Sequence, residues 1–188
     1  LFSKSDGNFF DVFEKLNSKI TINFNTIYIN NEDYLTNFKA DMIVNNNQIK
    51  DLILSSQFST KEDLKLSIKT NSNNERITDL FAGNAKPLVK KYGFIKGFDG
   101  GYLKFDSIEK NKVSNSNLKI FDFKLKEVPA LTKLLTLASL QGIADLLTGE
   151  GIRFNEFEMI FNNKDGLMTI EEIYSLGPSI SILMDGYI

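Results

Sequence analysis

Apolar and polar residues alternate with a repeat of two through most of the chain, which predicts β-strands. Ile20, Ile22 and Phe24 alternate with polar residues, and Ile27 and Ile29 then continue in a shifted phase, as a bulge or a bend requires. Further alternating runs, separated by polar breaks, lie at residues 34 to 44, 49 to 58 and 64 to 69. The first part of the chain therefore predicts an antiparallel meander.

Residues 77 to 101 are less regular and show no clear strand pattern. Apolar residues that follow Pro87 predict a short helix, which Gly93 ends. Gly97, Gly100 and Gly101 then predict a flexible turn into the next strand. A second short helix or turn is predicted at residues 8 to 17, from the mixed spacing of the phenylalanines there.

A hairpin is predicted from strands at residues 102 to 108 and 118 to 125, around the polar stretch 111 to 117. In its second strand the apolar Phe121, Phe123 and Leu125 alternate with two charged residues. This pattern predicts that these three apolar side chains share one buried face of the sheet.

The long segment 128 to 151 lacks strand alternation and predicts a helix from about residue 129 to 148. Its apolar side chains fall on two nearly opposite sides when plotted along a helix. One side carries Leu131, Leu134, Leu135 and Ala138, and the other carries Leu140, Ile143 and Leu147. The helix therefore needs cover from more than one direction: from its own sheet, from a second protein or from a lipid surface.

Strand patterns return at residues 152 to 161, 167 to 174 and 180 to 188. The whole chain thus predicts a mainly β (α+β) fold of about nine or ten strands, with one long apolar helix and one or two short helices. We expect a single unit with four consecutive parts. These are a strand meander (1–75), a short helix and hairpin (76–127), the central helix (128–151) and terminal strands (152–188).

Composition narrows the possible functions. The 42% of apolar residues supports a folded core, and the formal charge of −2 lacks the basic excess that nucleic acid binding needs. The chain has neither His nor Cys, which excludes catalytic triads, thiolate sites and the usual zinc sites. We therefore expect no catalytic residue, no cofactor, no metal and no nucleic acid partner.

Residues 161 to 172, FNNKDGLMTIEE, partly match a calcium-binding loop from the third position onward. However, Phe161 occupies the first ligand position, and the flanking residues alternate as strands where such a loop needs helices. We interpret Lys164, Asp165 and Gly166 as a hairpin turn and expect no calcium site.

A family resemblance comes from residues 120 to 159, IFDFKLKEVPALTKLLTLASLQGIADLLTGEGIRFNEFEM, and 166 to 188, GLMTIEEIYSLGPSISILMDGYI. Together they resemble the C-terminal region of AsmA-like proteins, close to the YhdP branch. In that family a strand pair leads into a Leu-rich helix with an ASLQGI-type core, a GxGIxF strand entry and a late GP-containing hairpin. The corresponding residues here are 138 to 143, 149 to 154, and Gly177 with Pro178. Residues 90 to 105 also resemble the family's segment before the hairpin.

The resemblance implies a periplasmic protein that is anchored to the inner membrane of a Gram-negative bacterium. Its long curved antiparallel sheet would form an apolar groove, similar to eukaryotic chorein-type lipid bridges and linked to phospholipid transport toward the outer membrane. The chain begins at Leu1, so we expect a piece of a longer protein whose anchor lies outside it. The family supplies no catalytic residues.

Two functions follow as expectations. The first is a lipid-handling segment that shields phospholipid acyl chains, in contact also with the remainder of the same polypeptide. The second is a structural or protein-interaction module of the bacterial envelope. The candidate lipid or partner contacts are Leu140, Ile143, Leu147, Phe121, Phe123 and Phe154.

Overall fold

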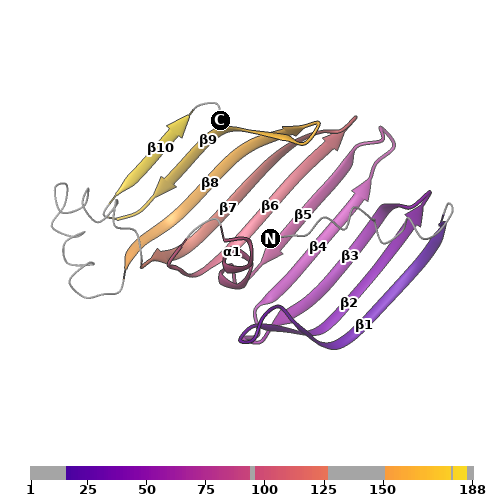
Figure 1. The fold of residues 1–188 in the computed structure, drawn as a ribbon, viewed down its shortest axis with the longest axis horizontal. Coiled ribbons are helices and arrows are strands. Elements are labelled where there is room, and N and C mark those ends of the chain that lie inside the picture. Colours follow the sequence, from indigo (N-terminus) through magenta and orange to yellow (C-terminus); the bar gives the residue numbers. More distant parts are fainter. Residues whose placement is uncertain (1–15, 94–95, 127–150, 179, 186–188) are drawn as a thin grey trace.

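The computed structural model describes residues 16–93, 96–126, 151–178 and 180–185. Within them, ten strands form one open antiparallel sheet in sequence order, accompanied by one short helix (Figure 1). The strands are β1 (Ser18–Tyr28), β2 (Tyr34–Asn45), β3 (Gln48–Phe58), β4 (Asp63–Thr70), β5 (Arg76–Ala82), β6 (Phe98–Lys110), β7 (Val113–Leu125), β8 (Ile152–Lys164), β9 (Leu167–Leu176) and β10 (Ser181–Asp185). The helix α1 (Lys86–Tyr92) lies between β5 and β6. The mainly β prediction is confirmed.

Tight polar turns explain why each strand pairs with its sequence neighbour. The β2–β3, β6–β7 and β8–β9 turns each hold two consecutive residues at positive φ, which suits the right-handed twist of a hairpin. These residues are Asn46 and Asn47, Asn111 and Lys112, and Asp165 and Gly166. The β4–β5 turn lies at this same end of the sheet, which we call the hairpin end; the opposite end, near α1, is the helix end (Figure 1).

A bulge in β2 confirms the phase shift predicted between Phe24 and Ile27. Asn37 has a φ of 52°, and the register of β2 against β3 shifts at this point. Phe38, the partner of Phe24, and Ile27 both pack against the main core cluster. The bulge thus keeps apolar residues from both halves of β1 on one face.

A second bulge corrects the predicted orientation of Phe121. Asp122 in β7 has a φ of 54°, which interrupts the alternation of side chains along the strand. Phe123 and Leu125 belong to the core cluster, whereas Phe121 stacks on Tyr102 outside it. Phe121 and Phe123 therefore lie on opposite faces, and the expectation that they share one face was wrong.

Three further predictions needed correction. The irregular segment contains a strand, β5, and the hairpin strands β6 and β7 run through most of the residues that we had interpreted as a polar connection. Gly100 and Gly101 lie within β6 rather than in a turn before it. The short helix is confirmed as α1, with Gly93 as its left-handed C-cap at φ 66°. The predicted long apolar helix lies outside the described residues, as does most of the predicted segment 8 to 17.

Candidate functional site

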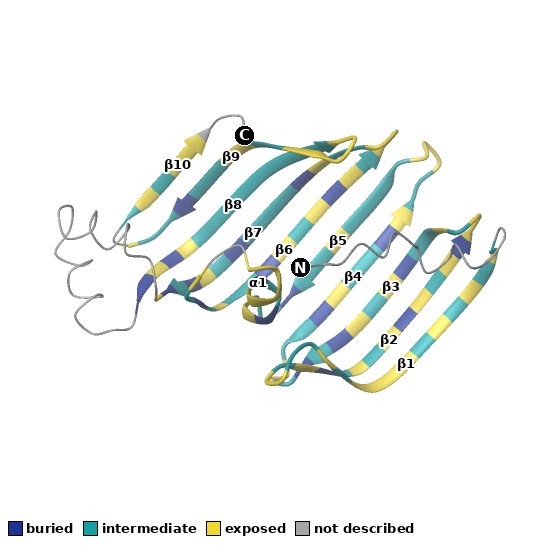
Figure 2. Cartoon of the chain, viewed as in Figure 1, coloured by how far each residue is buried: buried dark blue, intermediate teal, exposed yellow. Residues whose placement is uncertain are grey.

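Cross-strand register sorts the side chains of the sheet into two faces, because directly paired residues in neighbouring strands point to the same side. Val89 of α1 is fully buried in the same cluster as Leu103 of β6 and Ile120 of β7. We call the face that carries this cluster the apolar face. Figure 2 shows its buried residues as bands that cross the strands.

One row of paired residues on the apolar face, nearest α1, is almost completely enclosed. This closed row consists of Leu64, Ala82, Leu103, Ile120 and Phe157. The first four members are at most 8% exposed. Beside this row the Phe123 ring stacks between Phe98 and Phe154, with centroids 5.1 and 5.3 Å away. The helix end therefore holds a buried apolar core.

The next row toward the hairpin end is apolar but only half-buried. This open row consists of Leu54, Leu66, Leu80, Phe105, Leu118 and Met159. All six side chains have intermediate exposure. A continuous apolar strip over six strands thus keeps part of its surface accessible.

Polarity increases over the last two rows. The hydroxyl row consists of Thr78, Ser107 and Ser116, and the two serine hydroxyls share a hydrogen bond of 2.9 Å. The polar row at the hairpin end consists of Thr70, Arg76, Glu109, Ser114 and Asn163. The apolar face therefore changes from charged, through hydroxyl-bearing, to apolar within a few residues along each central strand.

A hollow of about 710 Å³ lies over this transition. It is bordered by the rings of Phe105 and Phe161, whose centroids are 6.4 Å apart, by the hydroxyl row and by charged residues of the hairpin end. A site with one apolar wall and one polar wall fits an amphiphilic molecule better than a purely polar substrate.

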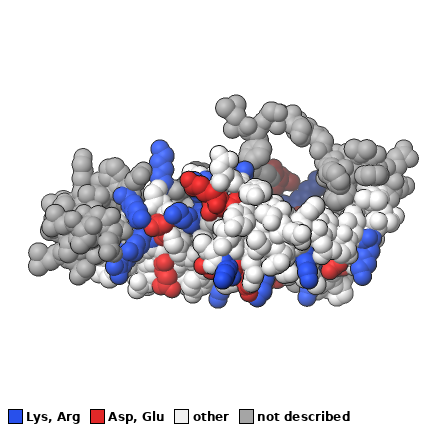
Figure 3. Space-filling model, turned by 90° about the horizontal axis from the view of Figure 1, so that it is seen from below, with Lys and Arg blue, Asp and Glu red and all other residues white. Residues whose placement is uncertain are grey.

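The opposite face carries charged side chains, some exposed apolar side chains and one aromatic cluster. Tyr102 of β6 stacks on Phe121 of β7, and Phe81 of β5 is tilted against Tyr102. The Lys104 ammonium lies 5.8 Å from the Phe121 ring centre. Figure 3 views the molecule from the helix end, and acidic and basic side chains are interspersed there too. Such mixed charge gives no single-sign field for a nucleic acid.

Ion pairs fasten the helix end. Asp99 of β6 accepts bonds of 2.7 Å from both Lys126, which follows β7, and Lys86 at the start of α1. These two lysines lower the pKa of the Asp99 carboxyl to about 2. The carboxylate therefore links α1 to the β6–β7 pair above pH 4.

The predicted contact residues separate into three groups. Phe123 and Phe154 are core residues, each 2% exposed. Phe121 belongs to the aromatic cluster of the opposite face. Leu140, Ile143 and Leu147 lie outside the described residues. Neither the open row nor the polar row was identified from the sequence as a candidate site. The signal for them lies in β5, where Arg76, Thr78 and Leu80 occupy alternate positions and so share one face.

Comparisons with protein-family models, with curated proteins and with solved structures find no match to this chain. No helix in the described part of the chain combines the length and the apolar character that crossing a membrane requires. Among those same residues, no group of three or more acidic side chains forms a metal site.

Proposed function

We propose that this chain is a non-enzymatic lipid-handling segment, in which the apolar face of the sheet shields phospholipid acyl chains. The open row carries the proposal, because six half-buried apolar side chains lie side by side next to a hollow with an apolar wall. Each CH₂ group removed from water contributes roughly 0.8 kcal/mol. Burial of only a few acyl carbons would therefore give measurable affinity.

The resemblance to AsmA-like proteins supports the cellular setting that we propose. In this setting the sheet is part of a longer groove in a periplasmic protein, which is anchored to the inner membrane and linked to phospholipid transport toward the outer membrane. The helix predicted for residues 129 to 148, which lie outside the described part of the chain, would extend the lipid surface through Leu140, Ile143 and Leu147. No catalytic residue, cofactor or metal has a part in this proposal.

The opposite face favours a second candidate, a protein-interaction module of the envelope. Ile53 and Ile108 are 60% and 52% exposed on that face, and Ile53 borders a hollow that Phe81 of the aromatic cluster also lines. Exposed apolar side chains and aromatic rings on one face are typical of a protein interface. The two candidates use different faces, so substitutions on one face can separate them.

The test replaces the open-row residues Leu80 and Leu118 by Ser together. The matched control replaces Ile53 and Ile108 by Ser on the opposite face. Native mass spectrometry of the purified chains should detect bound phospholipid in the wild type and the control, and several-fold less in the open-row variant. Circular dichroism confirms that each variant remains folded.

Two results would contradict the lipid proposal. One is a wild-type chain that neither retains phospholipid nor binds it when vesicles are added. The other is equal loss in the open-row variant and the control, which would assign binding to general apolar exposure.

A further inference from the structure

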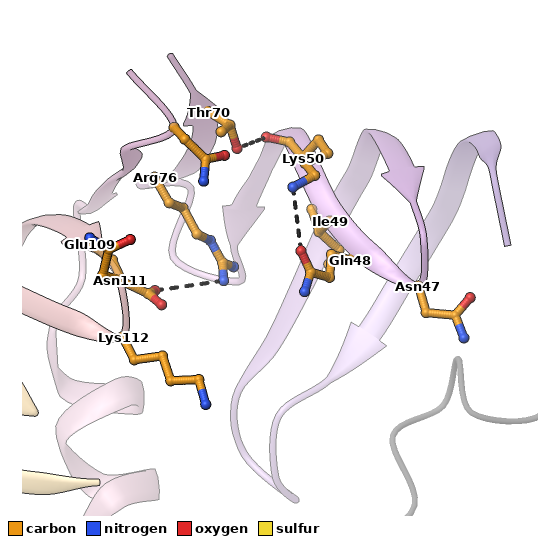
Figure 4. Close-up of a pocket in the computed structure, with 10 residues that line it drawn as sticks. Asn47, Gln48, Ile49, Lys50, Thr70, Arg76, Glu109, Asn111 and Lys112 are labelled. Carbon is orange, nitrogen blue, oxygen red and sulfur yellow. Dashed lines mark hydrogen bonds and ion pairs between the residues drawn. The ribbon is translucent and has the colours of Figure 1, made fainter. Parts of the chain in front are cut away.

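Three charged residues connect two hollows at the hairpin end. A polar hollow of about 480 Å³ is lined by Arg76, Glu109 and Lys112, together with Lys50 and several amide side chains (Figure 4). The first three of these residues also border the larger hollow that reaches Phe105 and Phe161. The charged groups therefore stand where a polar space meets the half-apolar one.

Positive charge predominates around the polar hollow. Lys50, Arg76 and Lys112 contribute three cations, and among the described residues Glu109 is the only acidic one that lines it. The neighbouring Lys110 is not available, because it pairs with Glu75 at 3.0 Å. A hydrogen bond from Asn71 and the Lys110 ammonium lower the pKa of Glu75, so this pair stays charged and neutralises itself.

The cations that line the polar hollow are incompletely paired. The Arg76 guanidinium approaches the Glu109 carboxylate only to 3.9 Å, and the Nε atom of Arg76 is buried without a hydrogen-bond partner. Lys50 donates one bond of 3.3 Å to Gln48, a neutral acceptor. In Figure 4 the Arg76 and Lys112 side chains extend toward the space that Gln48 borders from the other side. Because the Arg76 side chain as a whole is 43% exposed, its outer N–H groups can donate to an anionic ligand in the hollow.

We infer that this polar hollow binds the phosphate group of a glycerophospholipid whose acyl chains lie over the open row. The inference rests on the proposed function and adds where the head group binds. The change from polar row to apolar rows matches the change from phosphate to hydrocarbon within one lipid. Ala82 lies six positions after Arg76 along β5, a distance of about 20 Å at ~3.3 Å per position. One leaflet of a bilayer core is about 15 Å deep, so a single chain fits this length.

The experiment compares phosphatidic acid with diacylglycerol, both carrying the same fluorescent acyl chain, so that the phosphate is the only difference. The variant combines Arg76→Gln with Lys112→Gln. The control combines Lys19→Gln with Lys39→Gln on the opposite face and removes the same charge. We expect the wild type and the control to bind phosphatidic acid about tenfold more tightly than diacylglycerol, because only the phosphate can accept charge-assisted hydrogen bonds from Arg76 and Lys112. The variant should bind both lipids with the lower affinity.

Lys112→Gln alone provides a second variant, since Lys112 lies in an exposed turn and its replacement leaves the sheet intact. It should reduce the preference for phosphatidic acid by several-fold with an unchanged melting temperature. Equal affinity of the wild type for both lipids would overturn the head-group site and leave the proposed function standing. Binding of neither lipid would overturn both. A third result is that inorganic phosphate binds in an Arg76-dependent way while both lipids bind with equal affinity. The hollow would then recognise free phosphate, and its assignment to a lipid head group would be wrong.

Discussion

The two ends of the apolar face are built by the same strands and differ in how they are covered. At the helix end, Phe123 is 2% exposed within a stack of three rings, and four of the five residues of the closed row are at most 8% exposed. At the hairpin end, the open row is half-buried and the polar row borders two hollows. Alternation of residues thus determines which side chains share a face, but not whether that face is covered.

The connections between strands explain part of this difference. At the hairpin end the turns after β2, β6 and β8 have only two residues, so they leave no chain to fold back over the sheet. The β5–β6 connection at the other end runs from residue 83 to 97 and includes α1, which buries Pro87 and Val89 against the sheet. Longer connections at one end of a meander therefore produce a closed end and an open one.

The largest expected effect comes from replacing a phenylalanine at each of the two ends of the apolar face. Phe123→Ala in the closed stack should lower the free energy of unfolding by about 3–5 kcal/mol, because a large cavity opens in a packed core. Phe105→Ala in the open row should cost only about 1–2 kcal/mol, since its ring is already partly in water. Urea denaturation with matched m-values measures both. Equal losses would show that the open row is packed as tightly as the closed one.

Much of the fold was predictable from the sequence because a buried sheet face imposes strict alternation. The short helix after Pro87 and the hairpin turn at Asp165 and Gly166 are confirmed. The phase shift between Phe24 and Ile27 is confirmed as well, with its bulge at Asn37 in the neighbouring strand β2. Each has a local signal: a change of phase, a proline beside a later glycine, or a turn pair that tolerates positive φ.

The missed features lack such a local signal. The sequence around Asp122 alternates regularly between apolar and charged residues. Only the backbone φ of 54° at Asp122 shows the bulge that places Phe121 and Phe123 on opposite faces. Arg76 begins a strand that reads as irregular, and its partner Glu109 is 33 positions later in the chain. The candidate site depends on this pairing between distant residues. A single sequence does not show which residues of two strands pair with each other.

A smaller effect on stability is expected at Gly101, where the backbones of β6 and β7 approach each other closely near the helix end. Gly101 in β6 has a φ of 76°, and a Cβ there would lie 2.7 Å from the Phe121 carbonyl oxygen. Gly101→Ala should therefore destabilise the chain by about 2–3 kcal/mol, from backbone strain and a clash. Gly166→Ala is the control at the hairpin end, with a φ of 84° but nothing within 4 Å. It should cost only about 1 kcal/mol. A Gly101 variant as stable as the Gly166 variant would show that the sheet relaxes around the new methyl group.

The smallest effect concerns the ion pairs that tie α1 to the sheet at the helix end. The two lysines that bond to Asp99 depress its pKa from 3.8 to about 2, so they stabilise the folded state while the carboxyl is charged. This contribution is complete above the unfolded pKa of 3.8 and is lost as the pH falls toward 2. Because the Asp99 side chain is 30% exposed, solvent screening limits what these ion pairs add to the free energy of unfolding to about 1–2 kcal/mol. The Asp99→Asn variant lacks this one titrating group and keeps every other carboxyl. Comparison of the wild type with this variant therefore isolates the contribution of Asp99. The stability difference between the wild type and this variant should shrink between pH 4 and pH 2 in chemical denaturation experiments. A difference that stays constant over this range would show that Lys86 and Lys126 do not hold Asp99 in its charged form.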